Sequence, residues 1–347
     1  MQYRKLGNTD EELSLIGLGT MTWGEQNTQA EAFQQMDMAL ANGVNFFDAA
    51  EMYPIPPKPE TQGQTEAILG NWLAARGCRE KIFLATKITG REGRNAGLSH
   101  IRGGARLNRE HVFKAVDSSL KRLQTDYIDL YQVHWPERAT NFFGRLGYEH
   151  QQDDGVSIEE TLSALTELVQ QGKIRHIGLS NETPWGVMEY MRLAREKNLA
   201  RIQSIQNPYN LLNRTAEIGL TEICIREQIS FLAYSPLAFG KLTGKYLNGA
   251  QPEGARLTLY SRFARYDKVN AEEAITAYVA LANEHGISPA DFALAFVNTR
   301  DFTGSNIIGA TNLEQLQANI NSVDVALSED IFAAVADIHA RYPNPSP

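Results

Sequence analysis

Short apolar runs alternate with longer segments of helical periodicity along most of the chain. The runs are rich in β-branched and aromatic residues, a composition typical of buried strands. They occupy residues 13–19, 45–50, 81–87, 127–134, 174–181, 202–207, 229–235 and 305–310. The segments between them predict helices, so we expect a strand and a helix to follow each other eight times.

Capping signals mark where several of these helices begin and end. The start signals are Ser157 with Glu160 as a capping box, Thr183 before Pro184, and Ser288 before Pro289, and the stop signals are Gly43, Gly172 and Gly286. A further helix is expected near residues 329–341, at the C-terminal end.

An eightfold alternation fits a closed (β/α)8 barrel, which takes about 250 residues plus insertions as one domain. An open doubly wound sheet is the alternative, but no GxGxxG follows any run, and Gly17, Gly19 and Gly24 have the wrong spacing. We therefore predict an α/β fold, a (β/α)8 TIM barrel, with residues 1–347 as a single domain. The long segments 54–63, 88–108, 137–155 and 236–269 all follow strands, so they should extend the C-terminal face, where barrel active sites lie.

Most of the predicted strands end on polar or ionisable side chains. These are Asp48, Lys87, His134, Ser180, Asn181, Gln206, Tyr234 and Ser235. Taken singly, Asp48 could cap a turn, Lys87 could reach solvent, and His134 could be a hydrogen-bonded core histidine. In a parallel barrel, however, strand ends share one mouth, so these side chains can converge on one pocket.

A lysine that ends a run as apolar as KIFLAT must be partly desolvated, and Asp48 on the neighbouring strand is its expected partner. Tyr53 is within loop reach, and a buried ammonium should lower its pKa from about 10 toward the operating pH. No activated Ser or Cys pairs with a base, and the carboxylates are too few for a metal site. A tuned acid with a neutral hydrogen-bond donor suits protonation of a carbonyl oxygen while a cofactor delivers hydride.

The charge balance and the cysteine count exclude other classes of function. Lys and Arg total 33 against 41 Asp and Glu, so the net charge of -8 argues against nucleic acid as a partner. Cys78 and Cys224 are too few for a disulfide framework. The polar N-terminal residues and the lack of about 18 consecutive apolar residues argue against a membrane partner. We expect a cytoplasmic protein.

Eight motifs, in order, are similar to those of the aldo-keto reductase family across essentially the whole chain. They are GLGTMTW (17–23), NFFDAAEMY (45–53), ATK (85–87), YIDLYQVHWP (127–136), GLSN (178–181), IQNPYN (205–210), YSPLAFGKLTGKY (234–246) and IIGATNLEQL (307–316). The resemblance implies a (β/α)8 barrel that binds NADP(H) without a Rossmann domain and acts on a small-molecule carbonyl substrate.

The resemblance also implies roles for individual residues. Tyr53 would be the proton donor, with Lys87 lowering its pKa, Asp48 pairing with Lys87, and His134 orienting the carbonyl. The nicotinamide end would be held by Ser180, Asn181, Gln206 and Tyr234, with Thr20 and Met21 near the ribose. The pyrophosphate would contact Ser235, Pro236, Leu237, Ala238, Gly240, Lys241 and Lys245, and the 2'-phosphate Arg256, Gly309, Thr311, Gln315 and Asn319.

The sequence departs from the family pattern near the adenosine. Ala318 stands where many relatives carry a glutamate, and Gly309 and Gln315 where some carry a lysine or arginine. The preference for NADPH therefore depends on Lys241, Lys245 and Arg256.

Aromatic residues should line the substrate pocket. They are Trp23, Tyr53, Trp135, Phe142 and Phe143. Nearby, Arg91, Arg94, Arg102 and Arg106 could attract an acidic substrate, or they could pair with the acidic segment 149–154.

Two alternatives to a reductase stay open. One is a cofactor-binding regulator like the potassium-channel β subunits, which resemble this chain but lack the histidine that matches His134. The other is a barrel aldolase with Lys87 as a Schiff-base nucleophile, which pairing with Asp48 disfavours.

Overall fold

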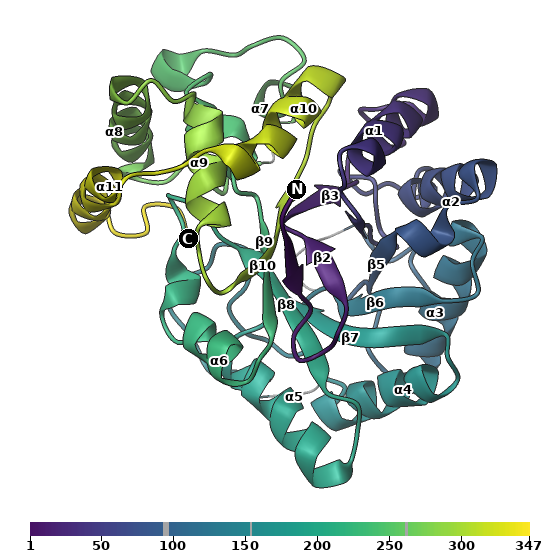
Figure 1. Ribbon diagram of the computed structural model, residues 1–347. Helices are drawn as coiled ribbons and strands as arrows, with labels where there is room; N and C mark the ends of the chain where they lie inside the picture. The colour runs from purple at the N-terminus through teal and green to yellow at the C-terminus, as the bar shows by residue number, and fades with distance from the viewer. Residues whose placement is uncertain (93–96, 153–154, 261–262) are drawn as a thin grey trace.

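The computed structural model describes residues 1–92, 97–152, 155–260 and 263–347. Its centre is a closed barrel of eight parallel strands (Figure 1). In order around the barrel, the strands are β10 (Thr303–Ile308), β3 (Ile16–Gly19), β4 (Phe46–Asp48), β5 (Phe83–Ile88), β6 (Ile128–Val133), β7 (Ile174–Ser180), β8 (Ile202–Pro208) and β9 (Ser230–Tyr234). Each overlaps one of the eight predicted runs, so the (β/α)8 TIM barrel is confirmed.

The first predicted run is divided in the structure. Its start belongs to β2 (Glu12–Ser14), which pairs antiparallel with β1 (Tyr3–Lys5), and β3 begins only after Leu15. This hairpin contributes Leu6 and Leu13 to an apolar cluster with inward-facing strand residues. It therefore closes the N-terminal end of the barrel.

Helices surround the barrel (Figure 1). They are α1 (Gln29–Ala41), α2 (Gln64–Arg76), α3 (Arg109–Leu123), α4 (Ile158–Gln170), α5 (Pro184–Lys197), α6 (Leu220–Arg226), α7 (Arg256–Leu259), α8 (Ala271–Glu284), α9 (Pro289–Asn298), α10 (Leu313–Asn321) and α11 (Glu329–Arg341). The C-terminal helix is confirmed as α11, which packs against α8. The segment 236–269 holds α7 and two short 3-10 helices, Ala238–Thr243 and Leu247–Gly249.

The predicted helix ends are found, with one correction. Thr183 and Ser288 cap α5 and α9, and a glycine in the left-handed region follows each of α1, α4 and α8. Ser157 caps α4 by accepting from the Glu160 amide at 3.1 Å. The capping-box prediction is wrong in its second half, because the Glu160 carboxylate accepts from the backbone of Arg109 instead.

The barrel interior changes from apolar to polar along the strands. Side chains two residues apart point to the same face of a strand, so Phe46 and Asp48 of β4 both face inward, as do Phe83, Ala85 and Lys87 of β5. Phe46, Phe83 and Ala85 belong to the apolar cluster at the hairpin end. Asp48 and Lys87 lie near the C-terminal ends of β4 and β5, and His134 follows β6, so the interior becomes polar at the C-terminal mouth.

Candidate active site

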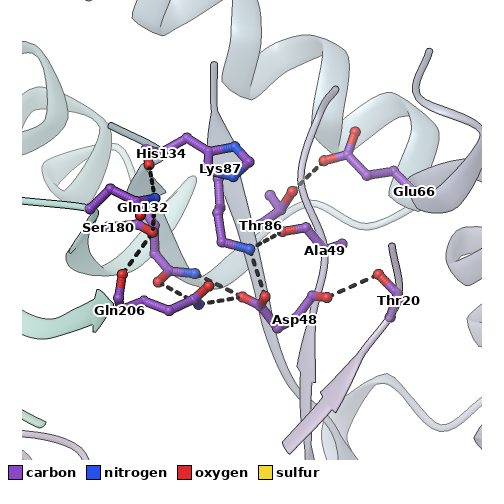
Figure 2. A network of polar contacts seen from close by, with 11 residues as sticks. Thr20, Asp48, Ala49, Glu66, Thr86, Lys87, Gln132, His134, Ser180 and Gln206 are labelled. Carbon is purple, nitrogen blue, oxygen red and sulfur yellow. Dashed lines mark hydrogen bonds and ion pairs between the residues drawn. The ribbon is translucent and has the colours of Figure 1, made fainter. Parts of the chain in front are cut away.

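A buried ion pair occupies the mouth of the barrel. Lys87 is fully buried, and its Nζ donates to Asp48 Oδ2 at 2.6 Å and to the Ala49 carbonyl at 2.8 Å (Figure 2). Burial lowers the pKa of Lys87, and the Asp48 carboxylate acts in the opposite direction. The pairing predicted for these two residues is present.

Two amide side chains hold the other oxygen of Asp48. Oδ1 accepts from Gln132 Nε2 at 3.0 Å and from Gln206 Nε2 at 2.9 Å (Figure 2). The sequence analysis singled out Gln206 but missed Gln132, which lies on β6 inside the predicted run 127–134 rather than at its end. The usable signal was its polar side chain two residues before His134, because that spacing places both side chains on one face of the strand.

Tyr53 lies in the loop after β4, next to this pair. Lys87 Nζ is 5.2 Å from the centroid of the Tyr53 ring. Burial, followed by the nearby Asp48 carboxylate, raises the pKa of Tyr53. The expectation of a lowered pKa is therefore wrong for this structure, because burial of the phenol, followed by the charge of Asp48, disfavours the phenolate. Tyr53 keeps its proton over the ordinary pH range.

His134 follows β6 and faces Tyr53. The two ring centroids are 5.7 Å apart in an edge-on arrangement. Burial, reinforced by the positive charge of Lys87, lowers the pKa of His134 well below its ordinary value. The imidazole is therefore neutral. Its Nδ1 is buried and has no hydrogen-bond partner among the described residues.

The residues predicted for the nicotinamide end form one hydrogen-bonded group. Ser180 Oγ donates to the Gln206 carbonyl at 2.9 Å, and Asn181 Nδ2 donates to the His134 carbonyl at 2.9 Å. Tyr234 OH donates to Asn181 Oδ1 at 2.6 Å. At the far side of β4, Thr20 Oγ1 donates to the Asp48 carbonyl at 2.9 Å, and Met21 beside it is partly exposed.

Arg265 is a neighbour of Tyr234 that the sequence analysis did not identify. Its Nη1 donates to Tyr234 OH at 3.1 Å, and its guanidinium carbon is 5.5 Å from the Phe143 ring centroid. It lies at the end of the segment 236–269, in a stretch with no matching motif. Only the folded loop brings it over the mouth.

The cationic residues predicted for the cofactor phosphates lie in different environments. Lys241 forms an ion pair with Asp267, and Lys245 is exposed next to Tyr246. Arg256 packs between the rings of Phe239 and Phe263, and no ion pair to a carboxylate is found for it among the described residues. Burial lowers the pKa of Arg256. A buried guanidinium without a carboxylate favours an anionic ligand.

The remaining predicted phosphate residues surround the start of α10. Gly309 is exposed, and a Cβ built there would lie 3.9 Å from a terminal nitrogen of Arg256. Thr311 donates to Gln315 Oε1 through its backbone and its hydroxyl, both at 3.1 Å, and Asn319 Nδ2 donates to the Gly309 carbonyl at 3.3 Å. The structure thus places Arg256 beside this helix start. The other predicted phosphate contacts follow β9 and run into the 3-10 helix Ala238–Thr243; they are Ser235, Pro236, Leu237, Ala238 and Gly240.

The aromatic lining differs from the prediction at one residue. Trp135 and Met52 pack with Tyr53, Phe142 and Phe143 in one apolar cluster at the mouth. Trp23 is fully buried in the main core, and its Nε1 donates to Gln35 at 3.0 Å. Its indole therefore does not line the substrate pocket, because it packs on α1.

The arginine-rich segment is held by carboxylates outside the predicted acidic stretch. Arg102 pairs with Glu51, and Arg106 pairs with Glu137. Arg94 and the aspartates at 153 and 154 lie outside the described residues. Within the described ranges, no His, Cys, Asp and Glu cluster could hold a metal, and no helix is long and apolar enough to cross a membrane.

Several known proteins are similar in sequence to this chain. The model of the Aldo/keto reductase family matches residues 15–340. Protein tas of Escherichia coli (strain K12) is 52% identical over 348 residues, covering 100% of both chains. An Aldo-keto reductase of Babesia bovis is 38% identical over 282 residues, covering 76% of this chain and 98% of its own. Uncharacterized oxidoreductase YrpG of Bacillus subtilis (strain 168) is 33% identical over 347 residues, covering 99% of this chain and 97% of its own.

These matches confirm the family resemblance inferred from the motifs, and the barrel agrees with it. The chain belongs to the aldo/keto reductase family, and it is an oxidoreductase.

Proposed function

We propose that this protein is an NADP(H)-dependent reductase of aldehyde or ketone carbonyls, with Tyr53 as the general acid. The observation that carries the proposal is the position of Tyr53, which lies between the buried Lys87–Asp48 pair and the neutral ring of His134. When bound, NADPH would supply the hydride that reaches the carbonyl carbon. The protein must supply a proton and a site for the developing negative charge on the oxygen.

The protonation states of the site suit this task. The raised pKa of Tyr53 keeps the phenol protonated until the carbonyl oxygen gains negative charge. The proton then passes from the phenol to that oxygen, which completes the alcohol. Lys87, whose Nζ is 5.2 Å from the ring centroid, stabilises the phenolate that is left. Solvent returns the proton after the product leaves.

His134 acts before and during proton transfer. Because its imidazole is neutral, it can donate one hydrogen bond to the substrate oxygen without competing with Tyr53 as an acid. Its unpartnered buried Nδ1 shows that the ring still has hydrogen-bonding capacity. Trp135 and Phe143 give the pocket an apolar wall, which favours aromatic or aliphatic carbonyl compounds.

The described residues fit a phosphorylated dinucleotide. Ser180, Asn181 and Gln206 supply polar groups at the nicotinamide end, and Tyr234 supplies a ring that can stack there. Arg256 supplies an uncompensated positive charge beside Gly309 at the other end. Selectivity for NADPH over NADH would come from Arg256, because the carboxylate of Asp267 already neutralises Lys241.

The experiment that tests the function is a panel of aldehydes and ketones, including a nitrobenzaldehyde, followed by the absorbance of NADPH. We expect the wild type to reduce at least one of these compounds. Tyr53→Phe should lose this activity but still bind NADPH. Turnover that survives in Tyr53→Phe would remove Tyr53 as the acid. NADPH binding without turnover of any carbonyl compound would favour a cofactor-binding regulator.

A further inference from the structure

Gln132 is a fully buried amide one residue before the end of β6. The strand register pairs it with Lys87 on β5 and with Gly178 on β7. A buried amide is costly unless its donors and acceptor are satisfied. Here Nε2 donates to Asp48 Oδ1 at 3.0 Å, and Oε1 accepts from Gln206 Nε2 at 3.1 Å (Figure 2).

These bonds assign the two oxygens of Asp48 to different partners. Oδ1 accepts from two neutral amides, and Oδ2 faces the ammonium of Lys87 at 2.6 Å. A carboxylate held in this way cannot rotate without breaking both amide bonds. Its second oxygen therefore stays directed at Lys87 Nζ.

The same amide joins the ion pair to the predicted cofactor site. Gln206 Nε2 contacts both Asp48 and Gln132, and the Gln206 carbonyl accepts from Ser180. Asn181, next to Ser180, donates to the His134 carbonyl. The hydrogen bonds thus run without a break from Lys87 through Asp48 and Gln132 to the side chains predicted to hold the nicotinamide.

We propose that Gln132 is a positioning residue of the reductase, which fixes the Asp48 carboxylate against Lys87 and links that ion pair to Gln206. This inference rests on the function proposed above. Gln132 is not expected to contact the reacting atoms, because its amide is already bonded to Asp48 and Gln206. It acts through Lys87, and its loss should change the pH at which Lys87 loses its proton.

The groups that surround Lys87 set this charge. They are Asp48 on β4, Tyr53 after β4, Glu66 on α2 and His134 after β6. Burial lowers the pKa of Lys87, whereas Asp48 and Glu66 raise it. A carboxylate free to turn away from Lys87 would support the charge less, and an added negative charge would support it more.

Two substitutions of Gln132 should therefore shift the pH at which Lys87 titrates in opposite directions. Gln132→Met keeps the length of the side chain but removes both hydrogen-bonding groups, so the alkaline limb of kcat/KM should move to lower pH, with kcat about tenfold lower. Gln132→Glu places a second carboxylate beside Asp48, so the alkaline limb should move to higher pH. Opposite shifts are not expected from a residue that only fills space.

The matched control is Ser204→Ala on β8. Ser204 is also fully buried in the barrel, and its Oγ has no hydrogen-bond partner among the described residues. Its removal should leave the pH profile unchanged. A second readout, urea unfolding at alkaline pH, does not need turnover. The free energy of unfolding should increase with pH once Lys87 loses its proton in the folded state, and this increase should begin at lower pH in Gln132→Met than in the wild type. Lys87 titrates in the folded state below its unfolded pKa, which fixes this sign.

The outcomes separate the two claims. Unchanged alkaline limbs in both Gln132 variants, or shifts in the same direction, would overturn the positioning role. A raised Kd for NADPH with an unmoved pH profile would also overturn it, because Gln132 would then act only through Gln206. If Gln132→Met does not fold, the direction in which Gln132→Glu shifts the alkaline limb decides whether Gln132 has the positioning role. Absence of turnover in the wild type would contradict the proposed function alone, and the unfolding profiles would still test the role of Gln132.

Discussion

The rings of Tyr53 and His134 meet edge to face with centroids 5.7 Å apart, at the point where β4 and β6 open into the mouth of the barrel. Both rings are close to Lys87 but respond to it differently. Burial keeps the phenol protonated and the imidazole neutral. A substrate oxygen between them would meet two hydrogen-bond donors, of which only Tyr53 is placed beside a cation that can stabilise its anion.

Tyr53→Phe should lower kcat by about 10²- to 10⁴-fold, the range expected when a general acid is removed. The Kd for NADPH should stay within about threefold, because no cofactor contact is predicted for the hydroxyl. Assays of carbonyl reduction measure kcat, and fluorescence titration with NADPH measures the Kd. Tyr131→Phe is the control, since the Tyr131 hydroxyl is buried and has no hydrogen-bond partner among the described residues. Equal losses in both variants would show that the effect is structural.

Lys87→Met should destabilise the folded protein by about 3–5 kcal/mol, because it leaves Asp48 buried without its cation. The double variant Asp48→Asn with Lys87→Met should recover part of this loss, since no charge then remains unpaired. Urea unfolding of the three proteins measures the free energies. The exposed pair of Lys114 with Glu110 is the comparison, and Lys114→Met should change stability little. A Lys87→Met protein as stable as the wild type would contradict the buried pair.

Arg256→Met should raise the Kd for NADPH by about tenfold or more, the loss expected for a hydrogen bond to a charged group, while the Kd for NADH changes less. The reason is that Arg256 lies beside Gly309 and pairs with no carboxylate in the part of the chain that the structure describes. Arg192→Met is the control, because Arg192 pairs with Glu189 and Glu196 on the exposed face of α5. Equal weakening of both dinucleotides by Arg256→Met would place its contact away from the 2'-phosphate.

The free energy of unfolding should fall as pH drops below about 6.5, the unfolded value for histidine. His134 has a folded pKa well below that value, so the unfolded chain binds the extra proton in this window. The contribution is at most about 1.4 kcal/mol per pH unit. Urea unfolding between about pH 5 and pH 8, the range in which an ordinary histidine changes its charge, measures this contribution. His134→Gln should reduce the slope, and a smaller slope should remain because burial also lowers the pKa values of His111, His176 and His339. A slope as steep in His134→Gln as in the wild type would assign it to those other groups.

The sequence predicted the barrel and the residues at its mouth because both follow from local patterns. Strands end where apolar runs end, and parallel closure then brings Asp48, Lys87 and His134 to the same rim. Gln132 was missed because it lies inside its run, where a polar residue carries no end-of-strand signal. Trp23 was misplaced because a motif position does not show that its indole packs on α1. The direction of the Tyr53 pKa shift was wrong because it depends mainly on how deeply the loop after β4 buries the phenol, which the sequence does not show.

The long loops show a second limit of sequence reasoning. Arg265 and Phe143 are far apart in the chain, in loops after β9 and β6, and their contact depends on how both loops fold over the mouth. The arginines at 102 and 106 were expected to meet either a substrate or the acidic stretch 149–154. They pair instead with Glu51 and Glu137, which lie in the loops that flank Tyr53 and His134.

The most direct test of the central claim uses NADPH that carries deuterium at the position from which hydride is transferred, and it follows that deuterium into the product. Mass spectrometry of the alcohol formed from a nitrobenzaldehyde should find one deuterium on the former carbonyl carbon with the wild type. In the same time, Tyr53→Phe should form about 10²- to 10⁴-fold less labelled alcohol. Tight binding of NADPH with no labelled alcohol from any carbonyl compound tested would contradict the proposal that this protein is a reductase.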